Sequence, residues 1–170
     1  MIYVGLESAS DRVMGACKKN NNQTWRVEEI LQIASRNDIG INLHLLVGLP
    51  EDDEESLNET YEFIKKYPYV TTAGFFRPIP GTSIIQGIKN SGLPLENNAD
   101  LDGYLKNFSN RWVDGVHLPT KYLSKDRVVY WKQKFDELIK GQGIPFRHFL
   151  DPKEVSRRIA QRFGRNDHRS

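Results

Sequence analysis

Three short apolar runs in the first half of the chain each end in a polar or Gly/Pro-rich segment, with helix-like sequence between them. The first run leads into Gly5-Leu6-Glu7-Ser8-Ala9, the second into Val47-Gly48-Leu49-Pro50-Glu51, and the third into Arg77-Pro78-Ile79-Pro80-Gly81-Thr82. Strands that alternate with helices in this way predict a parallel sheet with right-handed crossovers. Because ligands of parallel sheets and barrels bind at the carboxyl ends of the strands, these three segments form the candidate site.

The spacing of apolar residues predicts the elements of residues 1–92. Strands are expected over Met1–Glu7, Ile41–Val47 and Val70–Phe76, and helices over Asp11–Lys18, Thr24–Ser35, Glu54–Lys66 and Thr82–Lys89. Three strands are half of a six-stranded barrel. The predicted fold class is therefore α/β, either a partial (half) TIM-like barrel of parallel βα units or a small open sheet.

Residues 93–170 differ in character and are predicted as a second unit, an irregular segment followed by a helical C-terminal extension. Leu93–Thr120 is rich in Asn, Asp and aromatic residues, with one short helix expected near Leu101–Phe108. Ser124 is expected to cap a helix that runs to about Lys140, and a last helix is expected over Asp151–Phe163. A chain that opens inside a strand is typical of a piece cut from a longer protein.

The composition is that of a globular protein and argues against several partner classes. The net charge of +2 is too small to predict binding to nucleic acid or to an anionic membrane. No apolar run or leader-like segment predicts a membrane span or a secretory signal, so we expect a cytoplasmic protein. Cys17 is the one cysteine in the chain, so it cannot form an internal disulfide or hold a zinc ion or an iron–sulfur cluster alone.

Strand alternation places Glu7 on the inner side of the first strand, at its carboxyl end. Its carboxylate is suited to accept hydrogen bonds from ribose hydroxyls or an amino group. Alternatively, it is a structural carboxylate bonded to backbone amides of its own turn. Ser8 and Ser10 follow immediately, and residues of this type cap helices more often than they bind ligands.

The other two strands add three more candidates. His44 is predicted to be either a proton-transfer or ligand-binding group or a satisfied core histidine. Gly48 allows a ligand to approach the backbone closely. Arg77 is suited to pair with a substrate or cofactor carboxylate, or with Glu7. The acidic run at residues 52–55 is interpreted as a helix-capping and solvation device rather than a metal site.

In this order the motifs resemble the second half of a radical S-adenosylmethionine (radical SAM) barrel. Gly5-Leu6-Glu7-Ser8, followed by a helix that begins with Asp11, resembles the fourth strand of that family. Asn42–Glu51 is similar to the fifth strand: Gly48 and Glu51 match, whereas His44 and Leu46 replace the usual glycine and isoleucine. Pro78-Ile79-Pro80-Gly81-Thr82 resembles the exit of the sixth strand, especially in the branch with a cobalamin-binding domain. The resemblance covers Ile2 to about Ile85.

The resemblance implies S-adenosylmethionine (SAM) as cofactor. Glu7, Ser8 and Ser10 map to its ribose or amino group, and the backbone at Gly48, together with Arg77, maps to its adenine; His44 completes the cofactor-binding set. The family's Cys-x3-Cys-x2-Cys loop is absent, so a 4Fe-4S cluster, with or without cobalamin, is expected only in a complete parent.

The resulting hypothesis is the C-terminal part of a radical SAM enzyme, inactive alone or half of a split enzyme. Its expected partner is the missing N-terminal half-barrel, a partner subunit, or a second copy that associates through the open sheet edge. One alternative is a non-catalytic α/β binding or interaction module derived from that scaffold. Another is an unrelated α/β enzyme that uses Glu7, His44 and Arg77 differently.

Overall fold

The computed structural model describes residues 2–17, 24–37, 39–67, 70–78, 82–90, 92–93 and 119–142. Within them, strands and helices alternate along the chain as the sequence predicts. Their order is β1 (Ile2–Glu7), α1 (Asp11–Ala16), α2 (Thr24–Arg36), β2 (Ile41–Val47), α3 (Glu54–Lys66), β3 (Val70–Phe75), α4 (Ser83–Asn90) and α6 (Lys125–Gly141). The helices expected near Leu101–Phe108 and over Asp151–Phe163 lie outside the described residues, as does most of the irregular segment.

The three strands form one parallel sheet in the order β1-β2-β3, which confirms the predicted topology. Val4 pairs with Leu43 in β2, and Leu45 of β2 pairs with Ala73 in β3. The β1–β2 register shifts between Gly5 and Glu7, so the last residues of β1 depart from regular pairing. The fold is therefore α/β with a small parallel sheet; its closure into half of a barrel stays a prediction.

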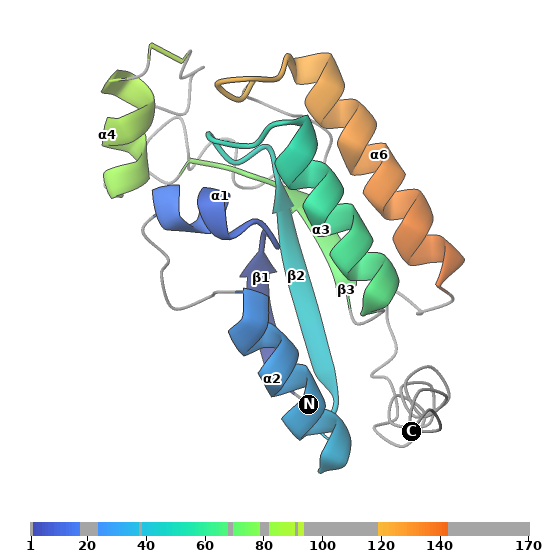
Figure 1. Cartoon of the computed structure of the whole chain (residues 1–170). Helices are drawn as coiled ribbons and strands as arrows, with labels where there is room; N and C mark the ends of the chain where they lie inside the picture. Colours follow the sequence, from blue (N-terminus) through green and yellow to red (C-terminus); the bar gives the residue numbers. More distant parts are fainter. Residues whose placement is uncertain are drawn as a thin grey trace, which may run out of the picture.

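Helices α2, α3 and α6 cover one face of this sheet (Figure 1). The apolar side chains of β2 enter a common core with residues from all three helices. That core includes Leu43, Leu45, Val47, Val27, Leu31, Leu57, Ile64, Val128, Trp131 and Phe135. Helix α6 thus packs on the sheet itself, in the same core as the first βα units. The boundary predicted at residues 92/93 stays a prediction, because residues 94–118 are not described.

The local sequence explains where α3 begins. The Asp53 side chain accepts a hydrogen bond from the Ser56 amide, and the Ser56 hydroxyl oxygen accepts one from the Asp53 amide, forming a capping box. Leu57 and Ile64 then fall on one side of the helix and are 1% and 0% exposed. The helix therefore starts at a fixed point directly after the loop that leaves β2.

The opposite face of the sheet is covered only in part by described residues. A small cluster of Val13, Leu49, Phe76 and Ile88 packs toward the carboxyl ends of the strands, where α1 and α4 lie (Figure 1). Farther down that face, Tyr3 is 60% exposed. We call this face, away from α2, α3 and α6, the open face. No helix among the described residues is both long and apolar enough to cross a membrane.

Candidate functional site

The exit of β1 has an unusual backbone conformation at Glu7. Its φ of 62° lies in the left-handed region, and the Ser8 amide donates to the Leu6 carbonyl oxygen at 2.8 Å across the tight turn. A non-glycine residue in this region carries backbone strain of about 1–2 kcal/mol. A Cβ built on Gly5 would lie 2.6 Å from Glu7 Oε1. The half-buried Glu7 carboxylate therefore folds back over Gly5, on the open face.

Ser8 and Ser10 are both 2% exposed. The Ser8 hydroxyl lies 3.3 Å from the Thr60 hydroxyl, and its oxygen accepts a hydrogen bond from the Ser10 amide at 3.1 Å. Ser10 is the N-cap residue of α1, although its side chain makes no capping hydrogen bond. The geometry gives Ser8 a structural role, tying β1 to α3. Contact of either serine with a cofactor stays a prediction.

The exit of β2 is held by a buried aspartate. Gly48 has a φ of +88°, and its amide donates to Asp52 Oδ2 at 3.0 Å. The Leu49 amide donates to the same oxygen at 2.9 Å, and the Ser56 hydroxyl donates to Asp52 Oδ1 at 3.3 Å. We call residues 48–53 the strand-exit loop. The Asp52 side chain, which belongs to this loop, holds the loop in shape through these hydrogen bonds.

Asp52 differs from the expected solvated acidic residue because its exposure is 0%. Burial raises its pKa from 3.8 to about 7, although the amides of Leu49 and Gly48 and the Ser56 hydroxyl act in the opposite direction. The expectation that the acidic run is a solvation device is therefore wrong at this position. Asp53, by contrast, caps α3 as predicted.

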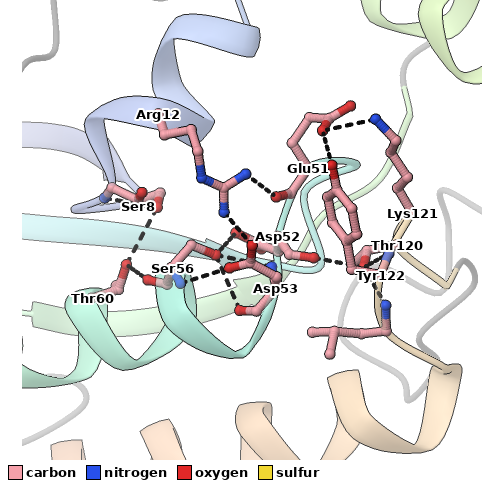
Figure 2. A network of polar contacts seen from close by, with 12 residues as sticks. Ser8, Arg12, Glu51, Asp52, Asp53, Ser56, Thr60, Thr120, Lys121 and Tyr122 are labelled. Atoms are coloured by element: carbon pink, nitrogen blue, oxygen red, sulfur yellow. Dashed lines mark hydrogen bonds and ion pairs between the residues drawn. The ribbon is translucent and has the colours of Figure 1, made fainter.

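A segment distant in the sequence closes over the strand-exit loop (Figure 2). The Thr120 hydroxyl donates to the Asp52 backbone carbonyl at 2.7 Å and accepts from the amides of Tyr122 and Leu123 at 3.1 and 2.8 Å. The Lys121 amide donates to the Pro50 carbonyl at 2.9 Å. These bonds fasten the segment that leads into α6 to the end of β2.

Two exposed pairs attach the neighbouring helices to the same region. Arg12 of α1 pairs with Asp53 and donates to the Glu51 carbonyl at 3.3 Å (Figure 2). Arg127 of α6 binds both carboxylate oxygens of Glu54 at 2.7 Å, which lowers the pKa of that carboxyl. The acidic run thus orients α1 and α6. Among the described residues, no group of three or more His, Cys, Asp or Glu side chains is arranged to hold a metal ion.

His44 lies on the open face, near the middle of β2. Its Nδ1 is hydrogen-bonded to Thr72 Oγ1 on β3, and its ring stacks on Tyr3 of β1 with centroids 5.7 Å apart. Arg77 follows β3 and is half-buried; within the described part of the chain no ion pair joins it to Glu7. The ends of β1, β2 and β3 thus bring Glu7, Gly48 and Arg77 to one edge of the sheet, below which His44 lies.

Sequence reasoning missed the residues that organise this edge. On the side where a Cβ of Gly48 would project, the space is filled by Val128 of α6, because that Cβ would lie 2.9 Å from Val128 Cγ1. The contributions of Arg12, Asp52 and Thr120 were also unforeseen. Only Asp52 had a local signal: an acidic residue four positions after a strand-ending glycine can reach the amides of its own loop.

No protein-family model matches this sequence. Among curated proteins, the chain is 25% identical over 119 residues to a tRNA-2-methylthio-N(6)-dimethylallyladenosine synthase of Acinetobacter baylyi, covering 68% of this chain and 25% of that protein. A synthase of the same name from Oleidesulfovibrio alaskensis is 30% identical over 83 residues, 48% of this chain and 18% of that protein.

A bacteriochlorophyllide d C-12(1)-methyltransferase of Chlorobaculum tepidum is 21% identical over 155 residues, covering 89% of this chain and 33% of that protein. In these alignments the chain spans from under a fifth to a third of the length of its curated relatives. The chain is therefore distantly similar to two kinds of enzyme, over a limited part of each.

Proposed function

We propose that this chain supplies the C-terminal half of a radical SAM barrel and that its strand ends bind SAM when the barrel is complete. The observation that carries the proposal is the parallel order β1-β2-β3, which brings Glu7, Gly48 and Arg77 to one edge. The distant similarity to a tRNA-2-methylthio-N(6)-dimethylallyladenosine synthase and to a bacteriochlorophyllide methyltransferase supports a radical SAM-related origin. The predicted cytoplasmic location belongs to the same proposal.

In the proposed complex, each residue binds or orients the cofactor. The Glu7 carboxylate accepts hydrogen bonds from the ribose or amino group, and its strained backbone supports a functional assignment. The backbone at Gly48 and the guanidinium of Arg77 border the adenine. The strand-exit loop holds this backbone in place through Asp52. Ser8 and Ser10 hold the start of α1 in place, and His44 faces the interior of the barrel.

The residues present do not fit an iron–sulfur cluster, because one cysteine cannot supply three thiolates. The cluster, and any cobalamin, therefore belongs to another segment of a longer enzyme or to a partner subunit. We infer that this partner adds a βα unit beside β1, whose Ile2 and Tyr3 are 49% and 60% exposed. Association of two copies through the same edge is the alternative assembly.

The test is SAM affinity in the assembled barrel. A tagged chain expressed in its own host is expected to co-purify with a polypeptide that carries a Cys-x3-Cys-x2-Cys loop. Calorimetric titration of SAM into this complex should show at least about tenfold weaker binding for Glu7→Gln, because a charge-assisted hydrogen bond contributes about 1.5–3 kcal/mol. Glu55→Gln, at an exposed position of α3, is the matched control.

The outcomes separate the proposals. Equal SAM affinities for wild type and Glu7→Gln would reduce Glu7 to a structural carboxylate. A complex without measurable SAM affinity would contradict the proposed function. A monomeric chain that binds neither SAM nor a cysteine-loop polypeptide would favour the second candidate, a binding module that kept only the scaffold. The well-packed core shared by β2, α3 and α6 is the observation in favour of that second candidate.

A further inference from the structure

A row of side chains crosses the open face of the sheet, with His44 at its centre. His44 pairs in register with Gly5 of β1 on one side and with Thr72 of β3 on the other. The Glu7 carboxylate lies over Gly5, within 2.6 Å of where a Cβ would be. A carboxylate, an imidazole and a hydroxyl therefore lie on three adjacent strands, on the same side of the sheet.

The imidazole of His44 is held at two points. Its Nδ1 is hydrogen-bonded to Thr72 Oγ1, and Tyr3 stacks on the ring with an angle of 19° between the ring planes. The hydrogen bond to Thr72 is the one that the His44 side chain makes with the described part of the chain. Nε2, the ring nitrogen farther from the backbone, has no such partner there. The half-buried ring is thus held in one orientation by Thr72 and Tyr3.

We propose that His44 is a general base on the open face and that Thr72 is its positioning residue. Nδ1–H donates to Thr72 Oγ1, which holds the neutral ring in the tautomer whose lone pair is on Nε2. A ligand bound against this face passes the proton of an acidic O–H or N–H group to Nε2. The electron pair of that bond stays on the ligand, and the ring becomes an imidazolium.

The surroundings of His44 favour this step and indicate the ligand class. Because Nδ1 is engaged by Thr72, Nε2 is the nitrogen that takes the proton. Tyr3 presents an exposed aromatic ring beside His44, which suits a planar ligand that stacks. We therefore assign to this face a planar ring compound with an ionisable O–H or N–H group. The assignment goes beyond SAM binding and does not depend on it.

The first test is the tautomer of His44, measured by 15N NMR of the imidazole nitrogens in the full chain at a pH where the ring is neutral. Wild type should show a protonated Nδ1 and an unprotonated Nε2. Thr72→Val keeps the β-branched shape but removes the acceptor, so the ratio of the two tautomers should fall about two- to tenfold. Thr72→Ser should restore it.

A second measurement uses diethyl pyrocarbonate, whose carbonyl carbon is attacked by an unprotonated imidazole nitrogen. His44 should be modified in wild type and in Thr72→Ser, and more slowly in Thr72→Val, by at most the factor of about ten by which the tautomer ratio falls. Peptides that contain His117, His148 or His168 serve as internal controls in the same digest.

A protonated Nε2 in the wild-type chain would overturn the proposal without any variant. A tautomer ratio that does not change in Thr72→Val would equally overturn the role of Thr72. Neither readout requires SAM, a cluster or a complete barrel. Failure of SAM binding therefore contradicts the proposed function alone, and failure of the tautomer test contradicts this inference alone.

Discussion

Gly48 at the end of β2 packs directly against Val128 of α6: a Cβ on the glycine would lie 2.9 Å from Val128 Cγ1. The same residue has a φ of +88°, which side chains rarely allow. Val128 is 0% exposed and has little room to move. One glycine therefore fixes both the direction of the strand-exit loop and the distance between that loop and the helix.

Gly48→Ala is expected to lower the free energy of unfolding by about 2–5 kcal/mol. Left-handed backbone strain contributes about 1–2 kcal/mol, and overpacking against Val128 contributes about 1–3 kcal/mol. Urea denaturation followed by circular dichroism measures the change. Gly87→Ala in α4 is the matched control, because a Cβ there meets nothing within 4 Å. In the Val128→Ala background, the overpacking part should vanish and the backbone part remain.

Asp52→Asn should change how stability depends on pH. Because the folded pKa of Asp52, about 7, lies above its ordinary 3.8, the folded chain keeps this proton when the unfolded chain has lost it. Wild type should therefore lose stability as pH rises from about 4 to about 7, relative to the variant. Asparagine keeps an oxygen for the amides of Gly48 and Leu49 but does not titrate.

The pH experiment compares free energies of unfolding of the two proteins at several pH values. Other carboxyls, such as Glu54 with its lowered pKa, add slopes of opposite sign, but these cancel in the difference. Glu59→Gln, at an exposed position of α3, is the matched control. If the difference in free energy of unfolding between wild type and Asp52→Asn does not change with pH, the raised pKa of Asp52 is refuted.

Thr120→Val should loosen the junction between the strand-exit loop and α6. Its hydroxyl donates once and accepts twice, and all three partners are backbone groups. Leaving them without a partner costs about 1–3 kcal/mol of stability. Hydrogen exchange at the Leu123 amide should accelerate, and Thr120→Ser should recover slow exchange. Equal exchange in wild type and Thr120→Val would show that the hydroxyl does not hold this segment.

The purified chain alone is expected to bind no iron–sulfur cluster and to leave SAM intact. A single cysteine cannot provide the three thiolate ligands that the resemblance requires. Anaerobic reconstitution with iron and sulfide, followed by absorption spectroscopy and chromatography for 5′-deoxyadenosine, is the measurement. A stable charge-transfer band together with that product would contradict the prediction.

The sequence predicted the parts of the fold that follow from periodicity. The three strands, their parallel order and the apolar face formed by Leu43, Leu45 and Val47 are confirmed. Alternation of side chains along a strand is set by the backbone itself, so a single sequence carries it. Alternation also predicted Glu7 on the same side as Gly5. The Glu7 carboxylate does lie over Gly5, but it reaches that position through a left-handed backbone conformation at Glu7 rather than through regular alternation.

What the sequence did not reveal depends on tertiary contact. Gly48 leaves the strand with a positive φ, so strand alternation no longer says where a side chain there would point. Thr120, whose hydroxyl donates to the Asp52 backbone carbonyl, follows 68 residues later and has no periodic signal. Thr72 was not singled out either, because its pairing with His44 requires the register between β2 and β3.

The bond between Thr120 and Asp52 also bears on how the chain is made. The two residues lie 68 positions apart, so a ribosome has finished α3, β3 and α4 well before Thr120 leaves the exit tunnel. Until then the Asp52 carbonyl oxygen and the Pro50 carbonyl oxygen have no backbone or hydroxyl partner from that segment. The connection between β2 and α3 should therefore reach its final structure late during synthesis, after β1 and β2 have paired. In a stalled nascent chain this connection would be accessible to proteases.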